Sequence, residues 1–415
     1  MSIFSRAEIW LPASKWLANW PVVACDQYSA QPEYWEAVAQ RVGNDPSALH
    51  LILPEAYLGQ PDEEERIQQI YAAMQQYLED GILNLYPHSY IYVERTLDSG
   101  IVRRGLIGKI DLECYEYTDV SEAPIRCTEK TVVERIPARR HVREGAVLEM
   151  PHILLLCNDE SRNVIEPFTW QKADMEPLYD VTLGERGGRV CGWLVPEAQA
   201  QAFDQRMHAF EQRVRQQFGE QKAPAVLAVG DGNHSLAAAK AWYEKLKEEH
   251  PEQDFSQHPA RYALVELENL QDEAQRFEPI HRLVSRVDAA ALLQALENEC
   301  GMKQEKAGHC LRWISGEKSG AIQLDPRLGE LAVGVLQSFL DRYTAKYGGE
   351  MEYIHGEEAL RQLALKQNSI GFLLPPFDKN ALFRAITLDG ALPRKTFSMG
   401  HAWDKRYYLE MRKIR

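Results

Sequence analysis

The most informative segment of the chain is AVLAVGDGNHSLAAAKAWYEKLK, which runs from Ala225 to Lys247. A short strand of small apolar residues, Ala225–Val229, leads into a glycine-rich turn, and a helix is predicted directly after it over Ser235–Glu249. Two glycines let the backbone turn sharply and approach a ligand closely. The first-turn N–H groups of the helix then face outward, where the helix dipole favours an anion. The stretch therefore predicts a strand–turn–helix unit with an anion site at the turn.

The turn also carries side chains suited to phosphate chemistry. Asp231 can bind Mg²⁺ or accept a proton from a hydroxyl, and His234 can contact a phosphate or act as an acid or base. We expect Gly232, Asn233 and Ser235 to bind phosphate, with Asn233 or Ser235 as the helix cap. The string lacks the GK[ST] ending of a P-loop and the third glycine of a dinucleotide-binding turn. A plain connection with a capping Asp and a solvent-facing His explains the same string without a ligand.

A second candidate segment is strongly basic. Residues 126–143 contain six bases and two acids, in a chain whose 61 acids and 47 bases give a net charge of −14. Arginine forks recognise phosphate and carboxylate oxygens, and Glu129 among them can be a general base or a metal ligand. For any single arginine a solvated loop paired with surface carboxylates is the better explanation, but the cluster as a whole favours anion binding. The candidates are Arg126, Lys130, Arg135, Arg139 and Arg140.

Three weaker signals complete the candidate site. Asp26 follows an apolar strand near the N-terminus, so it is a loop carboxylate. His281 and Arg282 end the string Pro279-Ile280-His281-Arg282, and Lys395 lies in the turn-like Pro393–Phe397. Taken alone, each of these residues is better explained by a structural role than by a ligand contact.

Length, charge and cysteines restrict the class of protein. The 415 residues suffice for two to three domains and a sizeable core. The net charge of −14 argues against duplex-DNA binding and against a polybasic membrane surface. The seven cysteines are widely spaced without a CxxC pair, and the N-terminus has no secretory signal pattern. We therefore expect a cytoplasmic protein with reduced thiols and no nucleic-acid or membrane partner; a homo-oligomer stays open.

Helical and strand-like patterns alternate along the chain, which predicts a mixed α/β (α+β) fold. Helices are expected at Asp62–Asp80, Glu197–Phe218 and Leu331–Tyr347. Ser89–Thr96 and Ile101–Tyr117 flank a turn and predict a hairpin. Further strands are expected at His152–Cys157, Arg261–Glu268, Ile370–Leu374 and Leu382–Leu388.

Six elements in this order resemble the bacterial and archaeal family catalogued as domain of unknown function 1015. Two positions depart from the family pattern: Ser235 stands where the motif has Arg, and Thr128 stands where it has His. The six matching elements are Val22–Tyr28, Arg103–Gly108, Ile125–Thr131, Gly230–Ser235, Pro279–Arg282 and Pro393–Thr396.

The DGNHSLAAAK string also resembles the signature helix start of the ParB/sulfiredoxin superfamily, whose members bind nucleotide or phosphate at this element. The resemblance implies a ParB/sulfiredoxin-like core with large N- and C-terminal elaborations. We expect regions 1–125, 126–285 and 286–415, with the phosphate-binding core in the second. It also implies that relatives act as free-serine kinases that use pyrophosphate or ATP.

The sequence thus predicts a kinase that phosphorylates the hydroxyl of a small metabolite, with L-serine as the leading acceptor. Asp231 would hold Mg²⁺, Glu129 would orient or deprotonate the acceptor, and His234 would contact a phosphate oxygen. Two alternatives use the same pocket: a nucleotide or polyphosphate hydrolase, and a non-catalytic protein that binds a phosphorylated metabolite. A DNA-binding partition factor is rejected because the net charge is acidic and no helix-turn-helix segment follows the motif.

Overall fold

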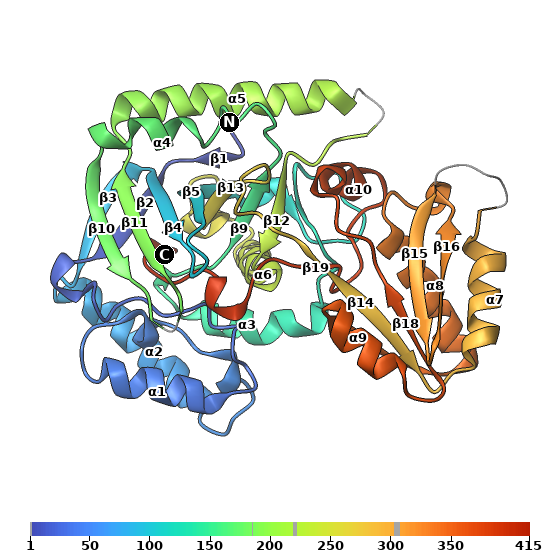
Figure 1. Cartoon of the computed structure of the whole chain (residues 1–415). Coiled ribbons are helices and arrows are strands. Elements are labelled where there is room, and N and C mark those ends of the chain that lie inside the picture. Colours follow the sequence, from blue (N-terminus) through green and yellow to red (C-terminus); the bar gives the residue numbers. More distant parts are fainter. Residues whose placement is uncertain (1, 185, 219–221, 303–307) are drawn as a thin grey trace.

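The computed structural model describes residues 2–184, 186–218, 222–302 and 308–415. These residues form two main sheets, each with its own helices, and the second sheet lies to one side of the first (Figure 1). Strands and helices mix throughout, so the predicted mixed α/β fold is confirmed.

The larger sheet is mixed and has ten strands in the described residues. Its pairing order is β10-β11-β4-β5-β13-β9-β12-β7-β6, with β1 paired to β5. The strands are β1 (Phe4–Ser5), β4 (Ile91–Thr96), β5 (Val102–Asp111), β6 (Tyr115–Glu116), β7 (Ile125–Cys127), β9 (Leu154–Cys157), β10 (Glu176–Thr182), β11 (Arg189–Leu194), β12 (Leu227–Asp231) and β13 (Tyr262–Asn269).

The second sheet has six described strands in the order β16-β15-β18-β14-β17, with β19 paired to β14. They are β14 (Glu278–Ser285), β15 (His309–Ser315), β16 (Lys318–Leu324), β17 (Glu350–His355), β18 (Ser369–Leu373) and β19 (Phe397–Ser398). Two small antiparallel pairs complete the strands: β2 (Ala7–Pro12) with β3 (Leu83–Ser89), and β8 (Leu148–Glu149) with β20 (Arg412–Lys413).

Apolar faces of the helices pack against these sheets. Buried Ile67, Ile70 and Met74 recur at helical spacing along α2, which explains why this segment folds as an amphipathic helix. The described helices are α1 (Pro32–Val42), α2 (Glu63–Glu79), α3 (Ile136–Glu144), α4 (Pro167–Gln171), α5 (Glu197–Phe218), α6 (Asn233–Glu249), α7 (Ala289–Cys300), α8 (Ala332–Tyr347), α9 (Glu357–Ala364) and α10 (Leu382–Leu388).

Most of the predicted elements are confirmed within a few residues at each end. The hairpin is the antiparallel pair β4 and β5, and the strand–turn–helix unit is β12 followed by α6. The strand predicted at Leu382–Leu388 is wrong, because this segment is helix α10. Five of its seven side chains are buried, and a short apolar run of this kind has no periodicity that separates a strand from a buried helix.

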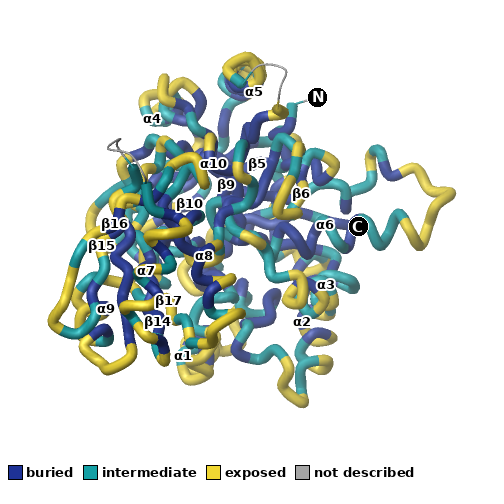
Figure 2. Tube along the Cα trace, turned by 90° about the vertical axis from the view of Figure 1, so that its right-hand side faces the viewer, coloured by how far each residue is buried: buried dark blue, intermediate teal, exposed yellow. Residues whose placement is uncertain are grey.

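Each sheet has its own hydrophobic core, and α10 joins them. Leu382 and Ile386 of α10 pack in one cluster with Leu156 of β9, Ala228 of β12 and Phe397 of β19. Buried backbone runs through the central strands, including β5 and β9, whereas exposed segments lie on peripheral loops (Figure 2). The larger sheet contains strands from both sides of residue 125, and the division at residues 125 and 285 stays a prediction.

No helix in the described parts of the chain is long and apolar enough to cross a membrane. The seven cysteines form no disulfide in the structure.

Candidate functional site

Three strand ends of the larger sheet meet at one edge and build the site. β7 and β12 are parallel neighbours, so the loop after Cys127 and the turn after Val229 emerge at the same edge. β9 is antiparallel to β12 and pairs Leu154 with Asp231, which places the start of β9 at this edge too. Topology therefore brings Glu129, the glycine turn and His152 together.

Segments near the two ends of the chain pair with each other and form a further wall of the site. Val23 bridges to Tyr407, and the Ala24 amide donates to the Arg406 carbonyl at 2.9 Å. This pairing places Asp26 beside Lys405. On the opposite side, Glu129 bridges to Leu392, which brings in the loop that carries Arg394 and Lys395.

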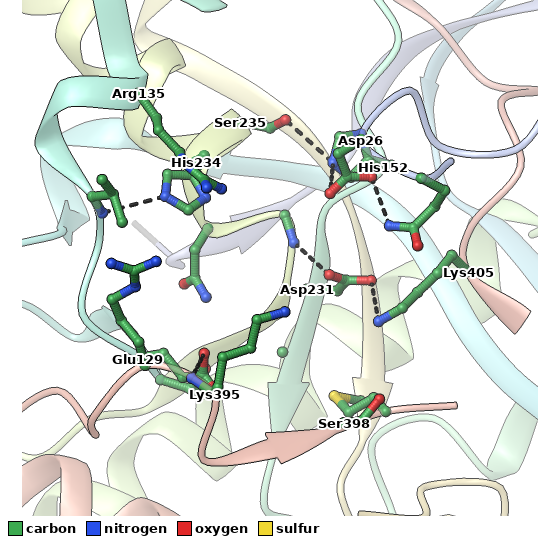
Figure 3. A pocket seen from close by; sticks show the side chains of 18 of the residues that line it. Asp26, Glu129, Arg135, His152, Asp231, His234, Ser235, Lys395, Ser398 and Lys405 are labelled. Carbon is green, nitrogen blue, oxygen red and sulfur yellow. Dashed lines mark hydrogen bonds and ion pairs between the residues drawn. The ribbon is translucent and has the colours of Figure 1, made fainter. Parts of the chain in front are cut away.

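These elements enclose a polar pocket with a volume of about 570 Å³ (Figure 3). Of the residues predicted for the site, it is lined by Asp26, Glu129, Lys130, Arg135, Arg139, Asp231, Gly232, Asn233, His234, Ser235 and Lys395. Further lining residues fall outside the predicted set, although Gln27 and Arg394 lie in the motifs around Asp26 and Lys395; they are chiefly Gln27, Ser29, Glu55, His152, Arg394, Ser398 and Lys405.

Four predicted binding residues lie outside the pocket. Buried Arg126 donates to backbone carbonyls, including that of Ala123 at 2.8 Å, and Arg140 pairs with Glu144 on its own helix. His281 is buried, and its Nδ1 accepts from the Leu374 amide. These side chains form hydrogen bonds or ion pairs with neighbouring protein groups and do not line the pocket.

Arg282, the fourth of these residues, holds a loop that lines the pocket. Its side chain is fully buried and donates to the carbonyls of Arg394 and Lys395 at 3.3 and 3.0 Å. Its Nε donates to the Gln337 amide oxygen at 2.6 Å. A buried guanidinium bonded to carbonyls braces the backbone, and here it fixes the loop whose side chains line the pocket.

The glycine turn adopts the geometry that its sequence predicts. Gly232 has φ of +82°, and a Cβ on it would lie 3.0 Å from the Ile153 Cα, so this position requires glycine. No side chain caps the start of α6, and the buried Oδ1 of Asn233 has no hydrogen-bond partner in the described structure. The amides of the first turn are therefore available to an anion.

His234 is held as a neutral imidazole. Its Nε2 accepts a hydrogen bond from the Val132 amide at 3.2 Å, so Nδ1 carries the proton. Burial lowers the pKa of His234 to about 4, helped by the positive charges of Arg139, Arg135 and Arg394. The ring can donate from Nδ1, but its Nε2 lone pair is already used and cannot take a proton from a substrate.

Glu129 anchors the loop that carries Arg394 and Lys395. Its two carboxylate oxygens accept from the amides of Lys395 and Thr396 at 3.1 and 3.0 Å. Burial raises the pKa of Glu129, although these amide donors oppose the change. Thr128, the departure from the family pattern, donates to the Val229 carbonyl at 2.7 Å and so ties this segment to β12.

On the other side of the pocket, Asp26 and His152 form a close pair. The His152 Nε2 lies 3.6 Å from Asp26 Oδ2 and 3.3 Å from Ser235 Oγ, while its Nδ1 contacts the Tyr408 hydroxyl at 2.7 Å. Burial opposes ionisation of both groups, but their mutual attraction outweighs it. It lowers the pKa of Asp26 and raises the pKa of His152 well above its usual value.

The other acids of the pocket also have partners. Asp231 Oδ2 lies 3.1 Å from Lys405 Nζ, and its Oδ1 accepts from the Gly232 amide at 3.1 Å. Glu55 is paired with Arg139. The described residues contain no group of three or more His, Cys, Asp or Glu side chains placed to hold a metal ion.

Three cations on the glycine-turn side differ from these paired groups. Within the described structure, the side chains of Arg135, Arg394 and Lys395 form no ion pair and no hydrogen bond. Figure 3 shows Arg135 and Lys395 near His234 and Glu129, whereas Asp26, His152 and Ser235 gather across the pocket. The pocket thus has an unpaired cationic side and a paired side.

The fold and this pocket define a class of α/β protein with an anion-suited site at a glycine turn. The family model described as "Protein of unknown function (DUF1015)" matches residues 7–343, so the chain belongs to this family. The family expected from the six sequence elements is confirmed; the ParB/sulfiredoxin likeness of the turn stays a prediction.

Comparison with solved structures gives distant similarities. A free serine kinase in complex with AMP has a TM-score of 0.36 and 12% identity, covering 74% of this chain and 90% of that chain. A mutant free serine kinase in complex with ADP gives the same TM-score and identity, covering 74% and 91%. SbnI with a C-terminal truncation, from Staphylococcus aureus, has a TM-score of 0.35 and 11% identity, covering 73% and 82%. A comparison with curated proteins finds no match.

Proposed function

We propose that this chain is a small-molecule kinase that transfers a phosphoryl group from pyrophosphate or ATP to a metabolite hydroxyl. The observation that carries the proposal is the cationic side of the pocket, where Arg135, Arg394 and Lys395 form no ion pair within the described residues and lie beside the uncapped start of α6. Phosphoryl transfer requires mainly that phosphates are clamped, neutralised and aligned with the acceptor. Unpaired cations and free helix amides supply that clamp.

His234 and Asn233 complete the donor side. The neutral His234 ring donates from Nδ1 to a phosphate oxygen without adding a charge of its own. Asn233 lines the pocket beside this ring, and its Nδ2 group can donate to a phosphate oxygen, whereas its Oδ1, unpartnered in the described structure, only accepts. Ser235, at the position of the motif arginine, adds a small hydroxyl that leaves room near His152.

We assign the acceptor side to the Asp26–His152 pair instead of to Glu129. Both Glu129 oxygens already accept backbone amides, so this carboxylate positions the Lys395 loop. Asp26 is ionised beside His152 and faces the pocket. The acceptor oxygen forms the new P–O bond as the bond from phosphorus to the donor's bridging oxygen breaks. The hydroxyl proton passes to Asp26, and the leaving group is ADP or phosphate.

Asp231, the predicted Mg²⁺ ligand, is paired with Lys405 and the Gly232 amide. The described residues therefore do not fit a preformed metal site, and no step in this proposal depends on one. A magnesium ion would have to arrive with the donor phosphates and displace Lys405 from Asp231. We assign to Asp231 the placement of the Lys405 ammonium within the pocket.

Free L-serine is the leading acceptor, because the ordered sequence motifs resemble a family with free-serine-kinase relatives. The test combines ATP, ADP and pyrophosphate with a panel of hydroxyl metabolites that includes serine, with and without added Mg²⁺. Products are read by ³¹P NMR, and phosphate release is measured in parallel without acceptor. Transfer to at least one acceptor supports the proposal. Release that no acceptor diverts identifies a hydrolase, and ligand binding without turnover identifies a binding protein; either result overturns the kinase.

A further inference from the structure

A second, apolar pocket opens beside the polar one. It has a volume of about 140 Å³ and is lined largely by buried hydrophobic side chains from α2, α3, α6 and the loops between. Those that define its walls are Leu53, Met74, Val142, Ala146, Met150 and Ala238. Nothing in the proposed transfer reaction uses these residues.

Four residues line both pockets, so the two spaces adjoin. They are Glu55, Arg139, His152 and Ser235. His152 is also the partner of Asp26, and Cys25, directly before Asp26, lines the apolar pocket. The apolar pocket therefore adjoins the paired side of the polar pocket, the side that carries Asp26, His152 and Ser235.

The size and chemistry of this pocket point to a small apolar group. Protein interiors leave few voids of this volume, and an apolar cavity of about 150 Å³ is large enough for a benzene molecule. The polar side chains on its walls are largely engaged: Glu149 accepts from the Leu264 amide at 2.8 Å and pairs with Arg412, and the Tyr408 hydroxyl contacts His152. A hydrocarbon group thus suits the pocket better than a nucleobase, whose ring nitrogens need partners.

We infer that the apolar pocket holds the hydrocarbon part of the acceptor alcohol and sets acceptor specificity. This rests on the proposed function, because an acceptor hydroxyl at Asp26 has its remaining carbon atoms next to the mouth lined by His152 and Ser235. The acceptor class is a small alcohol with a branched aliphatic or phenyl group near its hydroxyl-bearing carbon. Free L-serine, the leading acceptor of the proposed function, would react with this pocket empty and so bind more weakly than such an alcohol.

The first experiment measures binding without turnover. Benzyl alcohol is titrated into the full-length protein and into Ala238→Leu and Ala146→Leu, which fill the pocket from two different elements, and binding is followed by ligand-observed NMR. Ala241→Leu is the matched control, because Ala241 lies on α6 outside the pocket lining. We expect binding to the wild type and the control, and a loss of at least fivefold in whichever filled variant folds. Equal binding by all four proteins overturns the site.

The second experiment measures turnover with L-serine and 3-phenylserine under the donor that supports transfer. In the wild type we expect a KM about tenfold lower for 3-phenylserine than for L-serine, because burial of one apolar group contributes about that factor. In Ala238→Leu or Ala146→Leu we expect the KM values of the two acceptors to agree within about twofold. A ratio that the filled variants leave unchanged overturns the acceptor assignment, as does displacement of benzyl alcohol by AMP. If no acceptor is phosphorylated while the filled variants lose benzyl alcohol, the kinase proposal fails and the apolar site stands.

Discussion

The two sides of the polar pocket use charge in opposite ways. On the paired side, Asp26 is matched with His152 and Asp231 with Lys405, so the protein neutralises its own charges. On the other side, the side chains of Arg135, Arg394 and Lys395 form no ion pair within the described structure, although Lys395 lies near enough to Glu129 to oppose the rise in its pKa that burial causes. These three cations are exposed at the mouth of the pocket, where water can be replaced by an anion, and the charges of Arg135 and Arg394 add to the effect of burial in keeping His234 neutral. Under the proposed function, the negative charge of the donor lies against these cations and the reacting proton passes to Asp26 on the paired side.

The largest effect is expected from a change at Asp26. With Asp26→Asn we expect kcat to fall by about 10²–10⁴ while the KM for the phosphoryl donor changes little, because a general base is lost. Steady-state kinetics with the donor and acceptor found in the screen measure this split. Asp98→Asn, an exposed acid paired with Arg186, is the control. A kcat near the wild-type value would remove Asp26 from the mechanism.

Loss of the unpaired cations has the next largest effect. Arg135→Ala and Arg394→Ala should each raise the KM for the donor by about 10- to 100-fold, because each removes a charge-assisted contact to phosphate worth about 1.5–3 kcal/mol. Isothermal titration with pyrophosphate gives the same comparison without turnover. Arg327→Ala, an exposed arginine paired with Asp325, should leave both values unchanged. Unaltered pyrophosphate affinity in both pocket variants would contradict the charge comparison.

A change at Glu129 tests how the loop of Arg394 and Lys395 is held in place. Glu129→Ala leaves the amides of Lys395 and Thr396 without their acceptors, so the free energy of unfolding should fall by about 1–3 kcal/mol. Urea denaturation measures this loss, and Glu134→Ala on the neighbouring exposed turn is the control. We expect donor KM to rise less than in Arg394→Ala. If stability is unchanged and kcat falls as far as in Asp26→Asn, Glu129 is the base after all.

The two histidines give the smallest effect and the sharpest contrast. At pH 7 His152 should be protonated and His234 neutral, because their pKa values shift in opposite directions. NMR titration, assigned with His152→Gln and His234→Gln, should show no titration of His234 between pH 7 and about 5. Co-titration of both rings near the ordinary histidine value would refute the contrast.

These shifts also fix the sign of their stability terms. His234 has a lowered pKa, so its contribution is lost as pH falls from about 6.5, the unfolded value, toward about 4. His152 has a raised pKa, so its contribution is fully present below about 6.5 and is lost as pH rises through the folded value. Thermal unfolding of His234→Gln should therefore show a weaker loss of stability below pH 6.5 than the wild type.

Local patterns in the sequence determined the parts that depend on near neighbours. The small apolar strand, the two glycines and the helix after them specify the turn at Gly232, since positive φ and close backbone approach select glycine wherever the chain folds. The same holds for the hairpin of β4 and β5 and for the amphipathic α2. The family could also be predicted from the sequence, because six short elements occur in the family's order along the chain.

Which polar residues face the pocket depends on contacts between segments that are far apart in the sequence. Arg282 and Arg135 are equally basic in sequence, yet one is buried against carbonyls and the other lines the site. His152 and Lys405 carry no local signal, because an antiparallel strand and a chain-terminal segment, both distant in sequence from the turn, bring them to Asp26 and Asp231. The composition determines the net negative charge of the chain, whereas long-range strand pairing determines where Arg135, Arg394 and Lys395 come together.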